Sequence, residues 1–257
     1  DVFAQFDFTH FKNIHLSLGS RVYYFSNGKY LHLSPRIKTQ FFPESVFSYG
    51  FGYSKNYQFL HQLEFQTINS TDFWVISNEE QPPSSVNYFT TNIRIRPGNS
   101  WYLQAEAYYK IYSNLRIHSL TNQFISSAFE GGDNNRPFLF NNDGQAKGLE
   151  FLVKKRFNNF NISSTYTLSS TEIENRFIYD GEPFNPSYDR THQFSLSSDV
   201  VLSQGLSVYS SWTLATGSPS SLFNRHNDIE SRIGDYSRVD ISLRYSHNYY
   251  VNNKAEF

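Results

Sequence analysis

Histidine is the first residue type to test for chemistry, because an imidazole can act as a general base or as a metal ligand. The chain contains eight histidines, at positions 10, 15, 32, 61, 118, 192, 226 and 247. They form no HExxH motif and no pair at helical ligand spacing, and the chain has no cysteine to complete a zinc site. We therefore predict no metal site, and we assign no cofactor to the chain.

Motifs for nucleophilic catalysis or phosphate binding are also missing from the sequence. It has no GxSxG elbow, no Walker loop and no GxGxxG. A hydrolase would need a pair such as Asp189 with His192 at the mouth of a cavity. The favoured interpretation of the same segment is an ion pair between Asp189 and Arg190 that steadies a loop. We therefore predict that the protein is not an enzyme, and we name no catalytic residue.

Composition and charge bear on two further classes of protein. The 257 residues carry 22 Lys and Arg against 23 Asp and Glu, so the sequence lacks the basic field that attracts nucleic acid. Mean hydropathy is -0.54, and no apolar run approaches the roughly 18 residues of a membrane-spanning helix. A membrane strand stays open, because it needs only about 9 to 11 alternating residues. The high aromatic content, 18%, favours that class.

Alternation of apolar and polar residues with a period of two runs along most of the chain. In residues 101–112, Leu103 and Ala105 share one face while Gln104 and Glu106 share the other. Charged residues stay off the apolar face, as lipid contact requires, since a Lys or Arg there costs about 2 to 4 kcal/mol at the bilayer midplane. We predict an all-β chain of eleven antiparallel strands, at residues 1–8, 14–24, 30–41, 46–53, 86–95, 101–112, 146–156, 160–170, 188–201, 206–216 and 236–245.

The connections between these strands alternate in length. Short turns at 10–13, 43–44, 97–100, 158–159 and 202–205 alternate with long polar connections at 54–85, 113–145, 171–186 and 217–235; the link at 26–29 is an exception. Short periplasmic turns and long extracellular loops are typical of a transmembrane β-barrel. A soluble β-sandwich explains the alternation equally well, but it does not explain the asymmetry of the loops.

The number of strands predicts that the barrel is incomplete. Eleven is odd, residues 254–257 resemble the start of a twelfth strand, and residue 1 begins on the extracellular side if 10–13 is a periplasmic turn. We therefore expect residues 1–257 to be an incomplete C-terminal portion of one outer-membrane β-barrel domain, with strands missing at both ends.

Several runs also point to a known family through their order and spacing. They are Asp72-Phe73-Trp74-Val75, Tyr108-Tyr109-Lys110, Gly148-Leu149-Glu150, Tyr188-Asp189-Arg190-Thr191-His192, Thr216-Gly217-Ser218-Pro219 and Asp235-Tyr236-Ser237-Arg238-Val239-Asp240. Together they resemble barrel segments of TonB-dependent outer-membrane receptors, especially those of the Bacteroidetes type. The resemblance covers most of the chain and implies about strands 10 to 21 of a 22-stranded barrel.

The resemblance implies a location in the outer membrane of a Gram-negative bacterium and energised uptake of a scarce solute: an iron chelate, a glycan or a peptide. The implied partners are outer-membrane lipid, the protein's own N-terminal plug domain, a TonB-type energising protein and a surface lipoprotein. The plug and the TonB box do not occur within these 257 residues. A passive porin, or a structural barrel subunit of a larger envelope complex, therefore stays open as the alternative.

Eight residues are candidate contacts for a ligand or for the plug. Trp74 lies in a long loop and could stack on a ligand, although loop packing or anchoring at the membrane interface explains it equally well. For the charged residues of the wall, a charge network or contact with the plug is favoured over substrate selection, and for the pair at 190 and 192 a structural role is favoured. The full set is Trp74, Glu106, Tyr108, Glu150, Arg190, His192, Arg238 and Asp240.

Overall fold

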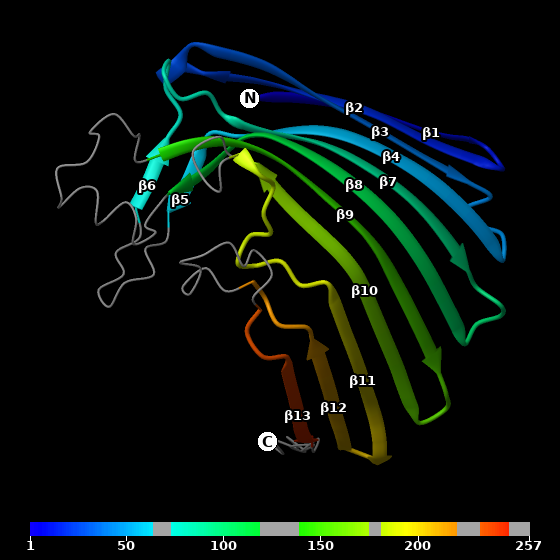
Figure 1. Cartoon of the computed structure of the whole chain (residues 1–257). Coiled ribbons are helices and arrows are strands. Elements are labelled where there is room, and N and C mark those ends of the chain that lie inside the picture. The colour runs from blue at the N-terminus through cyan, green and yellow to red at the C-terminus, as the bar shows by residue number, and fades with distance from the viewer. Residues whose placement is uncertain (64–72, 119–138, 175–180, 220–231, 247–257) are drawn as a thin grey trace, which may run out of the picture.

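The protein is built from antiparallel strands, which in the described residues form one large sheet and one small one. A computed structural model describes residues 1–63, 73–118, 139–174, 181–219 and 232–246. Eleven strands form a single curved sheet in which they follow one another in chain order, with β5 and β6 left out between β4 and β7 (Figure 1). They are β1 (Val2–Phe11), β2 (Ile14–Phe25), β3 (Tyr30–Phe41), β4 (Phe47–Gln58), β7 (Ser84–Ile95), β8 (Trp101–His118), β9 (Leu139–Arg156), β10 (Phe160–Glu174), β11 (His192–Ser203), β12 (Leu206–Ala215) and β13 (Tyr236–Tyr245).

Two short strands stand apart from the large sheet. β5 (Leu60–Leu63) and β6 (Phe73–Ile76) pair with each other inside the long connection between β4 and β7. A single 3-10 turn, η1 (Ser26–Gly28), joins β2 to β3. Among the described residues no helix has the length and apolar character to cross a membrane.

All eleven strands predicted for the large sheet are present, but several of their ends differ. β8 and β9 extend far into the connection predicted at 113–145, and their pairing continues past a bulge beside Asn114, whose φ is 56°. The prediction that a strand begins at residue 188 is wrong, because the N–H of Asp189 donates to the carbonyl of Pro186 and closes a turn there. β11 therefore begins only at His192.

The sheet has a polar concave face and an apolar convex face. Curvature crowds the side chains on the concave side, and the most buried positions of β3 and β4 are polar: Gln40 is 8% exposed and Ser48 is 0% exposed. Apolar residues of the opposite face stay open, with Phe51 53% and Ile93 45% exposed. The prediction that the apolar face of the sheet points outward is confirmed. In a protein with a closed apolar core, the apolar side chains would be buried and the polar ones exposed.

On β9 the convex face is apolar over the height of a bilayer core. On β9 the apolar residues Leu149, Phe151 and Val153 lie between Lys147 and Lys155, eight positions further along the chain. Eight residues at about 3.3 Å each span about 26 Å before tilt, which is of the same order as the roughly 25 Å apolar band of outer-membrane barrels. The end with the short turns, where Lys155 lies, corresponds to the periplasmic end of such a barrel.

The sheet is open within the described residues. β1 pairs only with β2 and β13 pairs only with β12, so each has one unpaired edge in this part of the chain. A barrel must close its edges. That further strands complete it remains a prediction.

Candidate functional site

The concave wall of β7–β9 carries large charged and aromatic side chains. Glu106 and Glu150 are direct cross-strand partners, and Tyr108 lies opposite Gly148 in the same register. The Nζ atom of Lys110 lies 4.9 Å from the ring centroid of Tyr108. The structure thus brings together three of the predicted candidates, Glu106, Tyr108 and Glu150, and adds a cation that stacks on the aromatic ring.

A second tyrosine completes this cation–aromatic cluster. Lys110 Nζ also lies 5.1 Å from the ring centroid of Tyr88, on the neighbouring strand. A Cβ atom at Gly148 would come within 2.6 Å of the Tyr108 ring, so the missing side chain provides the space in which that ring lies. We name Tyr88, Tyr108, Lys110 and Gly148 the aromatic wall site.

Glu106 and Glu150 place two like charges side by side on the wall. Directly opposed like charges destabilise an antiparallel pair, so this position favours a bound cation or hydrogen-bond donors from a neighbouring surface. Among the described residues there is no group of three or more His, Cys, Asp or Glu that could hold a metal ion.

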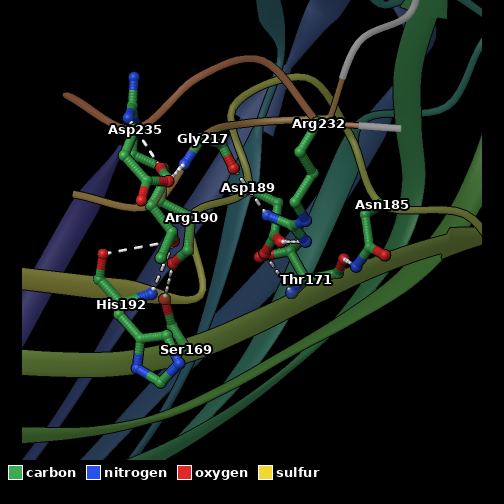
Figure 2. A network of polar contacts seen from close by, with 10 residues as sticks. Ser169, Thr171, Asn185, Asp189, Arg190, His192, Gly217, Arg232 and Asp235 are labelled. Carbon is green, nitrogen blue, oxygen red and sulfur yellow. Dashed lines mark hydrogen bonds and ion pairs between the residues drawn. The ribbon is translucent and has the colours of Figure 1, made fainter. Parts of the chain in front are cut away.

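The extracellular rim above β10 and β11 is organised around one buried carboxylate. Asp189 is 3% exposed, and its Oδ2 atom accepts a hydrogen bond of 2.9 Å from Arg232 (Figure 2). Its Oδ1 atom accepts a hydrogen bond of 2.8 Å from the backbone N–H of Thr171 on β10. Asp189 therefore ties the β10–β11 connection to β10 and to the β12–β13 connection.

The same connections are joined by further hydrogen bonds around Gly217. Arg232 donates to the carbonyl of Gly217 at 3.0 Å, and the N–H of Gly217 donates to Asp235 at 2.9 Å (Figure 2). Arg190 donates to the carbonyl of Thr216 at 3.0 Å. We name the group of Asp189, Arg190, Gly217, Arg232 and Asp235 the rim network.

The prediction that Asp189 forms an ion pair with Arg190 is wrong. Asp189 pairs with Arg232, whereas the Arg190 guanidinium lies 5.9 Å from the ring centroid of Tyr236. Arg232 is 43 residues away in sequence and lies in the β12–β13 connection, so local spacing gives no signal for it. The loop-steadying role expected for Asp189 is nevertheless what its bonds perform.

His192 lies apart from the candidates on the concave wall. It pairs in register with Leu168, and its Nδ1 atom lies 2.8 Å from the hydroxyl of Tyr166. Tyr166 pairs with Phe151, on the apolar convex face. His192 therefore shares the convex face with Tyr166. Arg190 precedes β11, lies outside its paired register and belongs to the rim network.

Trp74 lies on the exposed side of the small β5–β6 hairpin. It is 60% exposed and shares that side with Leu60 and Ile76, 45% and 49% exposed. The other side carries His61, which is 6% exposed. Burial, and then the positive charge of Arg116, lowers the pKa of His61 below its usual value.

The hairpin is held against the rest of the rim by polar contacts. Asn27 donates to the carbonyl of Ser77 at 3.2 Å, and the hydroxyl of Tyr30 donates to the carbonyl of Asn78 at 2.6 Å. Lys29 and Glu79 form an exposed ion pair of 2.9 Å. Trp74 therefore lies on a hairpin that these contacts hold in a fixed position.

Arg238 and Asp240 form a pair of their own on β13. A guanidinium nitrogen of Arg238 lies 2.8 Å from the Asp240 carboxylate, and about half of each side chain is exposed. The register places them opposite Thr213 and Ser211, on the concave face.

Small hydroxyl residues predominate on the concave wall of β10–β12, beside larger polar residues such as Asp199 and Tyr209, and this surface was not predicted. They share register rows in adjacent strands, and strict alternation in each strand is the signal that could have revealed them. A cavity of about 670 Å³ opens at the periplasmic end of this wall, where Ser163 and Ser197 line it. Residues of the neighbouring strands and of the turn before β8 also line it, among them Ser100, Trp101, Tyr102, Lys154 and Lys155. The hydroxyl residues are Ser163, Thr165, Thr167, Ser195, Ser197, Ser211 and Thr213.

No family model and no curated protein matches this chain. Solved structures do match its fold. The ferripyoverdine receptor of the outer membrane of Pseudomonas aeruginosa has a TM-score of 0.63 at 13% identity, over 95% of this chain and 32% of that chain. The ferric-catecholate import receptor Fiu of E. coli K12 has a TM-score of 0.64 at 12% identity, over 96% and 38%.

A further similar structure is OmpT, an outer membrane protein of Vibrio cholerae, with a TM-score of 0.52 at 10% identity, over 95% of this chain and 64% of that chain. This chain thus spans about a third of the two receptors and less than two thirds of OmpT. At these identities the likeness concerns the fold. The chain has the all-β antiparallel fold of Gram-negative outer-membrane barrels, as predicted, and in the described residues the barrel is open.

Proposed function

We propose that this chain forms part of the barrel wall of a TonB-dependent outer-membrane receptor that imports a scarce solute, with an iron chelate as the favoured class. The observation that carries the proposal is the breadth of the sheet. Eleven consecutive strands form one open arc, and receptor barrels cover 95% or more of the chain while the chain spans only about a third of them. An arc of this kind suits a barrel of about 22 strands.

The rest of the proposed barrel lies outside these residues. The eleven strands of the arc supply about strands 10 to 20, and the expected start of strand 21, at 254–257, lies outside the described residues. A plug domain closes the lumen and connects to a TonB-type energising protein. Glu106 and Glu150 face the plug, because two adjacent carboxylates on a wall are best satisfied by donors on a surface that fills the lumen. Arg238 and Asp240, already paired with each other, stiffen the wall.

Solute capture is the task of the aromatic wall site and of Trp74. Tyr88, Tyr108 and Lys110 offer two aromatic faces and one positive charge, which suit an aromatic or anionic chelate. Trp74 adds an exposed indole on a fastened extracellular hairpin. A glycan or a peptide would stack on the same aromatic side chains. Uptake measurements are therefore needed to identify the substrate class.

The test is uptake by cells that carry the full-length protein, with and without the energising protein. The probes are radiolabelled ferric complexes of catecholate and hydroxamate chelators, an oligosaccharide series and an oligopeptide series. We expect saturable uptake of a ferric complex that disappears without the energising protein. Uptake at an unchanged rate would contradict the proposal and identify a passive barrel, and an energised oligosaccharide or oligopeptide flux would replace the iron chelate as substrate.

A further inference from the structure

The convex face carries a single cation at its periplasmic end within strands β7–β11. Alternation places Lys155 there, as the direct cross-strand partner of Trp101. Most other convex positions at that end of these strands are apolar, and the polar exceptions, Ser164 and Ser198, carry no charge. The apolar positions are Ile95, Leu103, Val153, Phe160, Ile162, Val200 and Leu202. A charge at the edge of an apolar band must reach a polar partner at the interface.

Lys155 is held in place by its neighbours. Its Nζ atom lies 4.4 Å from the ring centroid of Trp101 and 5.3 Å from that of Phe157. It also donates a hydrogen bond of 3.0 Å to the hydroxyl of Ser100. The Phe157 ring stacks on the Phe160 ring with 3.9 Å between their centroids, and this contact holds Phe157 in place beside Lys155. These contacts hold the Lys155 ammonium in one position, so the group is preorganised for binding.

The charge of Lys155 is not neutralised by an acid in the described residues. Its contacts there are aromatic rings and one hydroxyl, and no ion pair includes it. An ammonium has three N–H donors, so two remain after the bond to Ser100. Trp101, 41% exposed, lies beside it at the level where tryptophans mark the headgroup region.

We propose that Lys155, Ser100 and Trp101 form a binding site for the headgroup of an anionic phospholipid in the periplasmic leaflet of the outer membrane. The phosphate accepts hydrogen bonds from the lysine ammonium and the serine hydroxyl, and the acyl chains lie along Leu103 and Val153. The leaflet at this end is built from phospholipid, which sets the source of the phosphate. This lipid site is independent of the solute that the barrel transports.

Native mass spectrometry of the full-length protein tests the site. The protein is released from micelles that contain equal amounts of phosphatidylglycerol and phosphatidylethanolamine, and the bound lipids are counted. We expect the wild type to retain phosphatidylglycerol preferentially and Lys155→Gln to lose about fivefold in that preference, as one lysine near a charged membrane surface supports. Lys147→Gln is the matched control, because it removes the lysine at the extracellular end of the same face of β9.

Equal lipid preference in wild type and Lys155→Gln would overturn the proposal, as would an equal loss in Lys147→Gln. Inorganic phosphate at the same concentration is added in a parallel experiment. We expect no displacement of the lipid, whereas displacement would assign the site to free phosphate and overturn the lipid assignment.

A second measurement tests the site without the Lys155→Gln variant, in case that variant does not fold. Brominated phosphatidylglycerol and brominated phosphatidylethanolamine are compared as quenchers of tryptophan fluorescence, and the contribution of Trp101 is taken as the difference between wild type and Trp101→Phe. Stronger quenching of Trp101 by the anionic lipid supports the site, and equal quenching by the two lipids overturns it.

Discussion

The two halves of the concave wall share one sheet and one register but differ in chemistry. The β7–β9 wall presents large side chains, including Tyr88, Tyr108 and Lys110, whereas the β10–β12 wall presents hydroxyls such as Thr165 and Ser197. In the first, side chains contact one another through ring faces and a cation. In the second, most side chains are short, and a cavity at the periplasmic end lies against Ser163 and Ser197.

Specificity and stability reside in different parts of the molecule. A wall of large groups in contact offers a shaped surface, while a wall of small hydroxyls offers polarity without shape. The order above the hydroxyl wall comes instead from the rim network, in which the buried Asp189 is bonded to Thr171 and Arg232. We therefore expect substitutions in the rim network to act on stability, those in the aromatic wall site on binding, and those in the hydroxyl wall on neither.

Asp189→Ala has the largest expected effect. It removes two hydrogen bonds from a buried carboxylate, and it leaves Arg232, which is about one third exposed, without its ion-pair partner. We expect a loss of about 2 to 3 kcal/mol of stability at the rim, less than for a fully buried pair because Arg232 reaches water. Cleavage of the β10–β11 connection by an external protease measures it. Asp240→Ala, which breaks a half-exposed pair, is the control, and an equal increase in cleavage would show that burial of Asp189 is unimportant.

Lys110→Gln tests the aromatic wall site. It removes the cation that stacks on Tyr88 and Tyr108, and we expect about a five- to thirtyfold loss of affinity for the transported solute, as about 1 to 2 kcal/mol of cation–π energy implies. Equilibrium binding to whole cells, normalised to surface abundance, is the measurement. Thr165→Val, on the hydroxyl wall, should change affinity less than twofold. If both variants lose affinity equally, the two walls do not differ in specificity.

Gly148→Ala should have a smaller effect on the same site. The new Cβ atom would lie 2.6 Å from the end of the Tyr108 ring, and that ring must rotate away. We expect about 1 kcal/mol of destabilisation and a modest loss of affinity, because a flexible side chain absorbs most of the overlap. The midpoint of thermal unfolding and the binding assay report the two effects. Unchanged affinity would remove Tyr108 from the site.

The smallest effect concerns pH and the β5–β6 hairpin. The pKa of His61 is lowered in the folded protein by burial and by Arg116, so the unfolded hairpin takes up a proton first as pH falls. The contribution of His61 to docking is therefore complete above its unfolded pKa, about 6.5, and declines as pH falls below that value. The rate of amide hydrogen exchange at residues 60–62 and 74–76, corrected for the intrinsic effect of pH, should increase when the pH is lowered from 7.5 to 5.5. His61→Gln should abolish the pH dependence; its persistence would assign it to another group.

Much of the fold could be predicted from the sequence because each strand encodes its own two faces. Alternation in residues 101–112 is enough to separate Ala105 from Glu106, and the predicted range 236–245 coincides with β13. The small hairpin could not be predicted, since its strands have only four residues each inside a long polar connection.

The candidate site was less predictable because it depends on contacts between distant segments. The pairing of Asp189 with Arg232 depends on two connections meeting above the sheet. The position of His192 depends on the register of β11, where a shift of one residue changes the face. Glu106, Tyr108 and Glu150 could be grouped from sequence because adjacent strands in an antiparallel sheet pair in order.

Thiol labelling of two adjacent positions on β11 tests whether the concave face lines a lumen and the convex face meets lipid. These 257 residues contain no cysteine, so Ser197→Cys and Leu196→Cys each introduce one new thiol into this part of the protein, the first beside the cavity and the second on the opposite face of β11. The full-length protein without either substitution gives the background labelling. The full-length variants in lipid vesicles are treated with a charged, membrane-impermeant thiol reagent. We expect labelling at position 197 and protection at position 196. Protection at 197 with labelling at 196 would contradict it.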